Sequence, residues 1–373
     1  MFLAFREMRR AKVRFGLLIA AVSLLLFLIL FQQALQNSLI TSFIGALERQ
    51  SAPVLVYTTD AQRAPFGSVI SPDLQRTISG VDSIEDSARI GVGSFTVQVD
   101  DGAESTATFF GYEQRDLGGP EAVSDGRLPA SASEAVGSAQ DFTLGQRVAV
   151  VPTGTGQAVE VTVVGLAADA ELLVTPTLFV DYDTYVSAVR AANPDARVVL
   201  PNLMGVRPRP GTSDTDLVSA INAASDDADA LTRAQAADES PGVAQVRQSF
   251  QIIFLLYGLV VPLITGLFFL IITFQKASSL TLLRAIGARS GTLVRSLLVQ
   301  VVVVVGGGIV LGTALFAPLS QVSLGTLALK FDWGNVAFWA VLLLSLGLLS
   351  ALVAARRVLA IDPIEATTGG EQR

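Results

Sequence analysis

Four long apolar runs dominate the hydrophobic pattern of the chain. The first begins at residue 15 or 16 and reaches residue 31, the second covers residues 250–274, and the last two cover about residues 297–316 and 336–355. A helix needs about 20 mainly apolar residues to cross the roughly 30 Å hydrocarbon core of a bilayer. The pattern therefore predicts a membrane protein with four transmembrane helices. We interpret the first run as a retained span rather than a cleaved signal peptide.

Between the first and second runs the pattern changes to short alternating segments. Alternation of apolar and polar residues predicts strands, and apolar positions spaced by three or four predict helices. Strands are expected over residues 52–59, 89–99, 105–112, 147–151, 158–166 and 177–181, and helices over residues 71–79, 183–191 and 212–228. The Asp/Ala-rich residues 225–239 are interpreted as a solvated helix end and loop. This mixture predicts one α+β domain, over residues 50–249.

Lysine and arginine next to the spans predict the orientation, because basic residues are enriched on the cytoplasmic side. Five basic residues precede the first span, four lie in residues 275–295, and Arg356 and Arg357 follow the last span. All three segments are expected to be cytoplasmic, with residues 50–249 outside the cell membrane. The chain then has three parts. Residues 1–49 form an amphipathic helix and the first span with an outer extension, residues 50–249 form the extracytoplasmic domain, and residues 250–373 carry spans two to four.

Composition narrows the possible chemistry. The chain has no cysteine and no histidine, so it has no disulfides, no thiolate metal site and no His-based catalytic triad. The sequence also has no G-x-x-x-x-G-K-[ST] motif for binding ATP. Residues 48–247 contain 28 acidic and 13 basic residues, which we attribute mainly to the solubility of an exposed domain. A catalytic role and a nucleic-acid partner are not expected.

Residues 275–295, "QKASSLTLLRAIGARSGTLVR", carry four positive charges and no negative charge. Leu280, Leu283, Ile286 and Gly287 fall on one stripe of a helix at this spacing. A cytoplasmic location alone would explain the positive charge of this segment, but it does not explain the apolar stripe.

The layout of one span, a large outer domain and three spans resembles the permease subunits of MacB/FtsX-type (type VII) ABC transporters. Four stretches in matching order carry this resemblance: "LAFREMRRAKVRF" at the start, residues 128–166, "RAIGA" within residues 275–300, and "IDPIEA" near the end. Within the family, the start and the "FQKASSLTLLRAIGARS" segment look most like haem-exporter permeases (HrtB-like).

The resemblance implies a homodimer of permeases bound to two copies of a separate ABC ATPase subunit, which binds the ATP. The basic segment would be the coupling helix that rests on the ATPase and carries its motion into the spans. Its contact residues would be Leu280, Leu283, Arg284, Ala285, Ile286, Gly287, Ala288 and Arg289. Haem would be the transported substrate, with no cofactor bound permanently and no metal other than haem iron.

Without histidine or cysteine, a haem iron ligand must come from Met, Tyr, a carboxylate or water. Apolar positions at residues 35, 39, 43 and 47 step by four and predict that the first helix continues past the lipid, ending near Glu48. Glu48 also stands where the resembling exporters carry a glutamate, so it is the expected iron or haem-edge ligand. Phe43 could stack on the porphyrin, Arg49 could pair with a propionate or with Glu48, and Tyr257 could face the same cavity.

Two other functions fit the same architecture. One is an FtsX-like regulator that acts on an external partner, and the other is an exporter of another amphipathic compound or of a peptide. Haem-dependent absorption would distinguish a haem exporter from both of these alternatives.

Overall fold

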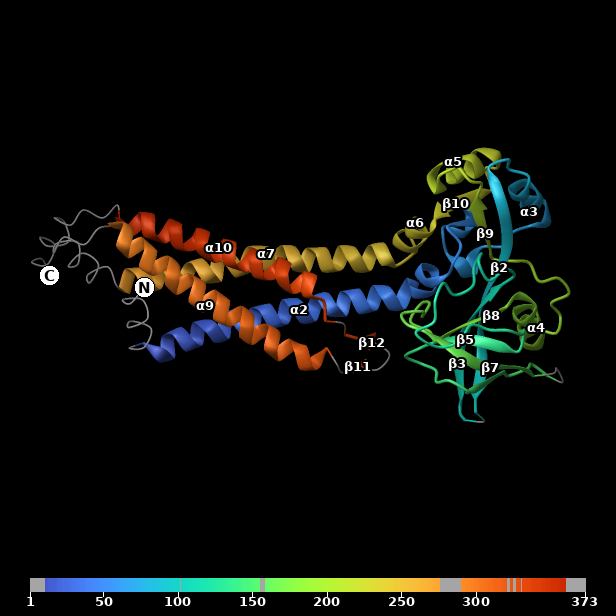
Figure 1. Cartoon of the computed structure of the whole chain (residues 1–373), viewed down its shortest axis with the longest axis horizontal. Helices are drawn as coiled ribbons and strands as arrows, with labels where there is room; N and C mark the ends of the chain where they lie inside the picture. The colour runs from blue at the N-terminus through green and yellow to red at the C-terminus, as the bar shows by residue number, and fades with distance from the viewer. Residues whose placement is uncertain are drawn as a thin grey trace, which may run out of the picture. The chain divides into compact units, whose positions relative to one another are not determined.

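The computed structural model describes residues 11–100, 102–154, 158–275, 290–320, 323–324, 327–329 and 331–359. The chain divides into two compact units (Figure 1). The membrane unit comprises the residues up to Gln36 and from Ser249 onward, and the outer unit comprises Asn37–Gln248. Helix α2 (Lys12–Arg49) is continuous from one unit into the other.

Four helices of the described residues are long and apolar enough to cross a membrane. They are α2, α7 (Val243–Gln275), α9 (Ser290–Leu319) and α10 (Trp333–Leu359). A short hairpin of β11 (Ser323–Leu324) and β12 (Leu327–Ala328) lies between α9 and α10 in the chain. The expected four-span layout, with an α+β domain between the first and second spans, is confirmed.

Small residues let α9 approach α2 closely within the membrane unit. A Cβ atom added at Gly308 would lie 2.5 Å from Cγ1 of Val22, and one added at Gly312 would lie 2.7 Å from the carbonyl oxygen of Ser23. Real Cβ contacts are essentially never this short, so only glycine fits at these positions. Close approach of this kind is a common way for membrane helices to associate, because lipid gives no hydrophobic driving force between them.

The outer unit is built on a ten-stranded mixed sheet. Its strands run in the order β10-β1-β9-β2-β3-β8-β5-β7-β4, and β6 pairs with both β2 and β7. The strands are β1 (Val54–Thr58), β2 (Ile84–Val99), β3 (Glu104–Tyr112), β4 (Asp125–Gly126), β5 (Glu134–Ser138), β6 (Arg147–Val150), β7 (Val159–Ala167), β8 (Thr177–Asp181), β9 (Leu203–Pro208) and β10 (Ala228–Thr232).

The double pairing of β6 closes part of this sheet into a ring. Strands β2, β3, β8, β5, β7 and β6 pair in turn, and β6 returns to β2. Closure removes exposed strand edges. The apolar residues of the ring include Phe95, Phe109, Val163 and Leu178, and they form one core cluster together with side chains of α4 (Tyr182–Ala192).

Strands β10, β1 and β9 continue the sheet beyond β2, and helices cover this part of it. Val54 and Val56 of β1 share a cluster with Leu74 and Ile78 of α3 (Pro72–Ser79) and with Leu217 and Ile221 of α5 (Asp214–Ala224). Figure 1 shows α3 and α5 beside β9 and β10. The opposite face of β1 holds Leu55 and Tyr57, which cluster with Ala46 and Leu47 of α2 and with Ala236 of α6 (Arg233–Asp238). The outer end of α2 is therefore part of the domain core.

The six strands and three helices expected from the sequence are present in the structure, although the third helix ends at Ala224 and not at residue 228. The interpretation of residues 225–239 was wrong. Residues 228–232 form β10, which pairs antiparallel with β1, and α6 follows it with a capping box at Thr232. Ala228 and Ala230 are buried against α5, and Asp229 pairs with Arg63. The strand depends on pairing with β1, since Asp and Ala have low intrinsic preference for strands.

Candidate functional site

The candidate site lies on the last two turns of α2, within the outer unit. Three of the residues expected from the sequence, Phe43, Glu48 and Arg49, are on this segment. Ala46 and Leu47 are fully buried in the domain core, and Glu48 and Arg49 are exposed. Burial of one face of the helix end fixes where the charged residues on the other face point.

A loop of the outer domain holds this helix end by its backbone. We call residues 168–175, which connect β7 to β8, the clamp loop. The amides of Leu173 and Val174 donate to the carbonyl oxygens of Phe43 and Ser42, at 3.0 and 2.8 Å. In the other direction, the Ala46 amide donates to the carbonyl oxygen of Glu171 at 3.0 Å. The clamp loop is therefore held to α2 by backbone–backbone hydrogen bonds.

The clamp loop adopts an unusual backbone conformation to make these bonds. Asp169, Leu173 and Val174 have φ angles of 58°, 51° and 60°. Left-handed backbone is uncommon for residues other than glycine, and it is a clear outlier for a β-branched residue such as Val174. Such residues cost about 1–3 kcal/mol each and persist only where the surrounding structure holds them. The three helix–loop hydrogen bonds and the packing of Leu172 in the domain core provide that support.

Arg49 is engaged by the clamp loop rather than by its neighbour Glu48. Its Nη2 atom lies 3.1 Å from Oδ2 of Asp169, whose side chain is only 8% exposed. Half of the Arg49 side chain is exposed, however, and Nη2 alone forms the bond to Asp169. A guanidinium has five N–H donors, so Arg49 can still donate to a second acceptor.

The Glu48 carboxylate accepts no hydrogen bond from any residue that the structure describes, and it lies on the part of α2 that belongs to the outer unit. Partial desolvation raises the pKa of Glu48 above the ordinary value. Arg49 and Arg233 oppose this shift, whereas Asp238 and Asp169 add to it. Glu48 is therefore an accessible carboxyl that holds its proton more tightly than a glutamate in water.

Phe43 is half-buried and already packs within the outer unit. It lies against a small cluster of Ile44, Ala237 and Val243, and its ring edge is close to the backbone at Gly242. Tyr257 lies on α7 in the membrane unit, where it packs against the helix core with its ring centroid 6.4 Å from that of Phe254. The structure therefore brings Phe43, Glu48 and Arg49 together on one helix end and places Tyr257 in the other unit.

The eight residues expected to contact the ATPase lie within residues 280–289, outside the described residues. Sequence reasoning missed the clamp loop. It contains no glycine to mark its left-handed positions, and only the three-dimensional contact with α2 identifies Asp169 as the partner of Arg49.

No family model matches the chain. It is 30% identical over 112 residues to a protein of Staphylococcus haemolyticus named as hemin transport system permease protein HrtB. Two Staphylococcus epidermidis proteins with the same name are 26% identical over 113 residues. Each match covers 30% of this chain and 32% of the relative, so the chain matches about a third of the length of these relatives.

Two solved structures have similarity to the outer unit. The periplasmic region of MacB from Actinobacillus actinomycetemcomitans has a TM-score of 0.36 and 13% identity, over 52% of this chain and 94% of that one. The extracellular domain of the noncanonic ABC-type transporter YknZ from Gram-positive bacteria has a TM-score of 0.32 and 12% identity, over 48% and 99%. The HrtB matches and the four-span fold confirm the expected resemblance to an HrtB-like ABC permease subunit.

Proposed function

We propose that this chain is the permease subunit of an ABC-type efflux system that expels haem from the membrane. The observation that carries the proposal is the similarity to proteins named as hemin transport permeases. Four apolar helices with an outer domain between the first and second supply an architecture suited to that role. The permease itself catalyses no reaction in this scheme, and a separate ATPase subunit hydrolyses ATP.

The proposed working unit is a homodimer on two ATPase subunits in the plasma membrane. The chain ends and residues 275–295 face the cytoplasm, and the outer unit faces the exterior. Motion of the ATPases enters through Arg284 and its neighbours and moves the spans, a mechanotransmission mechanism. The continuity of α2 supports this scheme, because a single helix joins the first span to the domain core.

Glu48 is the proposed haem ligand at the outer end of α2. A carboxylate is one of the few iron ligands available in a chain without histidine or cysteine. The two chains of a homodimer would supply two copies of Glu48. Arg49 would donate an N–H to a propionate while it remains bonded to Asp169, and Phe43 would present its exposed edge to the porphyrin. Tyr257 is the alternative ligand from the membrane unit.

A haem titration of the purified permease–ATPase complex tests the proposal. We expect a saturable Soret band in the wild type and a shifted or weakened band in the Glu48→Ala variant. Glu104→Ala is the matched control, because Glu104 is also an exposed glutamate of the outer unit but belongs to β3 and not to α2. A Soret band that is unchanged in Glu48→Ala would remove Glu48 as the ligand and make Tyr257 the next candidate. If no band rose above that of empty detergent, haem would be rejected as the substrate.

A further inference from the structure

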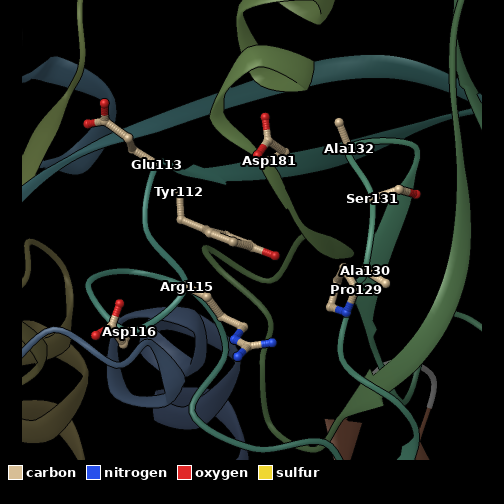
Figure 2. Close-up of a pocket in the computed structure, with 9 residues that line it drawn as sticks. All are labelled: Tyr112, Glu113, Arg115, Asp116, Pro129, Ala130, Ser131, Ala132 and Asp181. Carbon is tan, nitrogen blue, oxygen red and sulfur yellow. The ribbon is translucent and has the colours of Figure 1, made fainter.

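A hollow of about 640 Å³ lies in the outer unit, and none of its lining residues belongs to α2 (Figure 2). It opens at the carboxyl ends of β3 and β8, which are adjacent and parallel and end at Tyr112 and Asp181. The segments that follow β3 and precede β5 complete its wall, with residues 113–116 on one side and residues 129–132 on the other. Ligands commonly bind in hollows of this size, at places where a few polar groups converge.

Both walls of the hollow are fixed by hydrogen bonds before any ligand binds. The carbonyl oxygen of Arg115 accepts from Oγ of Ser51 at 2.8 Å and from the Gly119 amide at 3.1 Å. On the other wall, the carbonyl oxygen of Ala132 accepts from Oγ1 of Thr184 at 2.6 Å. A preformed wall lowers the ordering cost of binding.

Two acidic residues of the wall are already neutralised by arginines outside it. Glu113 accepts from Nε and Nη2 of Arg89, at 3.0 and 2.7 Å, and these bonds lower the pKa of its carboxyl. Asp116 is 2.7 Å from Nη2 of Arg207, which lowers its pKa in the same way. Neither carboxylate therefore needs the positive charge of Arg115.

Arg115 itself forms no side-chain hydrogen bond or ion pair with the part of the chain that the structure describes. Figure 2 shows its guanidinium and the Tyr112 hydroxyl pointing toward the same space. Burial raises the pKa of Tyr112 to about 12, so its hydroxyl keeps its proton at neutral pH. That hydroxyl also has no hydrogen-bond partner in the described residues. The hollow thus presents a cation and a neutral donor to one acceptor.

We propose that this hollow binds a single carboxylate group, held by Arg115 and the Tyr112 hydroxyl. A planar guanidinium binds a carboxylate through two parallel hydrogen bonds, and the hydroxyl can donate a third. A phosphate or a polyanion is disfavoured by the surrounding negative charge. The Asp181 carboxylate also lines the hollow, and residues 48–247 contain 28 acidic residues. The carboxylate belongs either to a small acid or to a peptide. This inference does not depend on the proposed transport function.

Fluorine NMR of the full chain in detergent, with 3-fluorotyrosine at its five tyrosines, tests the proposal. The Tyr112→Phe variant identifies the Tyr112 signal. We expect sodium acetate to shift that signal saturably, and sodium chloride at equal ionic strength to leave it in place. The Arg115→Gln variant should weaken acetate binding at least tenfold. Arg190→Gln is the matched control, since Arg190 is an exposed arginine of α4 outside the hollow, and it should bind acetate like the wild type.

Further probes decide the class and source of the ligand. Phosphate that bound more tightly than acetate would overturn the proposal, as would an acetate shift that survives in Arg115→Gln or is lost in Arg190→Gln. An amino-acetylated dipeptide with a free carboxyl end is the peptide probe. Tenfold tighter binding of the dipeptide than of acetate would support a peptide source. Equal binding would support a small acid.

Discussion

A Cβ atom placed on Gly45 would lie 2.3 Å from the backbone carbonyl oxygen of Asp169. Helix α2 and the clamp loop are in direct backbone contact here, and no side chain fits between them. Two of the helix–loop hydrogen bonds, to Phe43 and from Ala46, lie within two residues of Gly45. Gly45 is therefore required for the clamp, although glycine weakens a helix by about 1 kcal/mol relative to alanine.

Gly45→Ala should destabilise the outer unit. Alanine favours the helix by about 1 kcal/mol, but the added methyl group overpacks the contact, which costs about 1–3 kcal/mol, and displaces the hydrogen bonds of the clamp loop. We expect a lower thermal unfolding midpoint and faster hydrogen exchange at the amides of Leu173 and Val174. Gly16→Ala is the control, because a Cβ on Gly16 meets no atom of the described part of the chain within 4 Å, apart from the backbone of its own helix turn. Unchanged exchange in Gly45→Ala would show that the clamp loop is not held by α2.

Asp169→Asn should have a small effect on stability and a larger effect on haem binding. Half of the Arg49 side chain is exposed to solvent, so loss of its ion pair with Asp169 is expected to cost about 1 kcal/mol. Asparagine tolerates left-handed backbone, so the loop conformation is kept. Arg49 then loses the negative charge that partly neutralises it, and haem affinity should rise several-fold if Arg49 pairs with a propionate. A fall in affinity would instead show that Asp169 positions Arg49 for binding.

Haem affinity should depend on pH through Glu48. A carboxyl group binds iron in its ionised form, and desolvation raises the pKa of Glu48 above its ordinary value of 4.5. Affinity should therefore fall as the pH is lowered toward that raised pKa, at a higher pH than for an ordinary glutamate. Titrations of haem across pH 4–8 measure this. The pH dependence should be absent in Glu48→Gln, and its persistence in that variant would assign it to another group.

The raised pKa of Glu48 also makes folding stability depend on pH, in the opposite direction to haem affinity. A carboxyl whose pKa is higher in the folded chain than in the unfolded chain binds its proton more tightly when folded. Its contribution to stability is present at low pH and is lost as the pH rises through the raised pKa. Glu48→Gln removes this loss, so we expect the variant to be at least as stable as the wild type at neutral pH. A clearly lower unfolding midpoint at neutral pH would show that ionised Glu48 makes a stabilising contact.

Local signals in the sequence were sufficient for much of the outer fold. The apolar spacing predicted a helix over residues 212–228, and the structure has α5 there, capped by Ser213, whose Oγ accepts from the Asp216 amide at 3.1 Å. The step of four through Leu39, Phe43 and Leu47 predicted the continuation of α2, and the helix ends at Arg49. These features depend on neighbouring residues, which is why they can be read without a structure.

Features that depend on distant partners were not predictable. β10 is a strand because β1 supplies its hydrogen bonds, and nothing in "ADALT" indicates that pairing. Asp169 is 120 residues from Arg49 in the chain, and its left-handed conformation is not encoded by a glycine. The hollow at Arg115 likewise forms from segments after β3 and before β5 that meet only in the folded domain.

Gly308→Leu should disrupt the packing of α9 against α2. A Cβ atom at position 308 would lie 2.5 Å from Val22 and 3.2 Å from the Ser23 amide nitrogen, so a leucine must push the two helices apart. Overpacking of this kind costs about 1–3 kcal/mol or more, and close backbone approach is a main source of helix association in lipid. We expect a lower unfolding midpoint of the purified chain and loss of transport. Gly306→Leu is the matched control on the same helix, because among the described residues a Cβ there meets no atom within 4 Å apart from the backbone of its own helix turn. If both variants behaved alike, the effect would come from replacing glycine in α9 generally, and the specific contact with Val22 would be excluded as the cause.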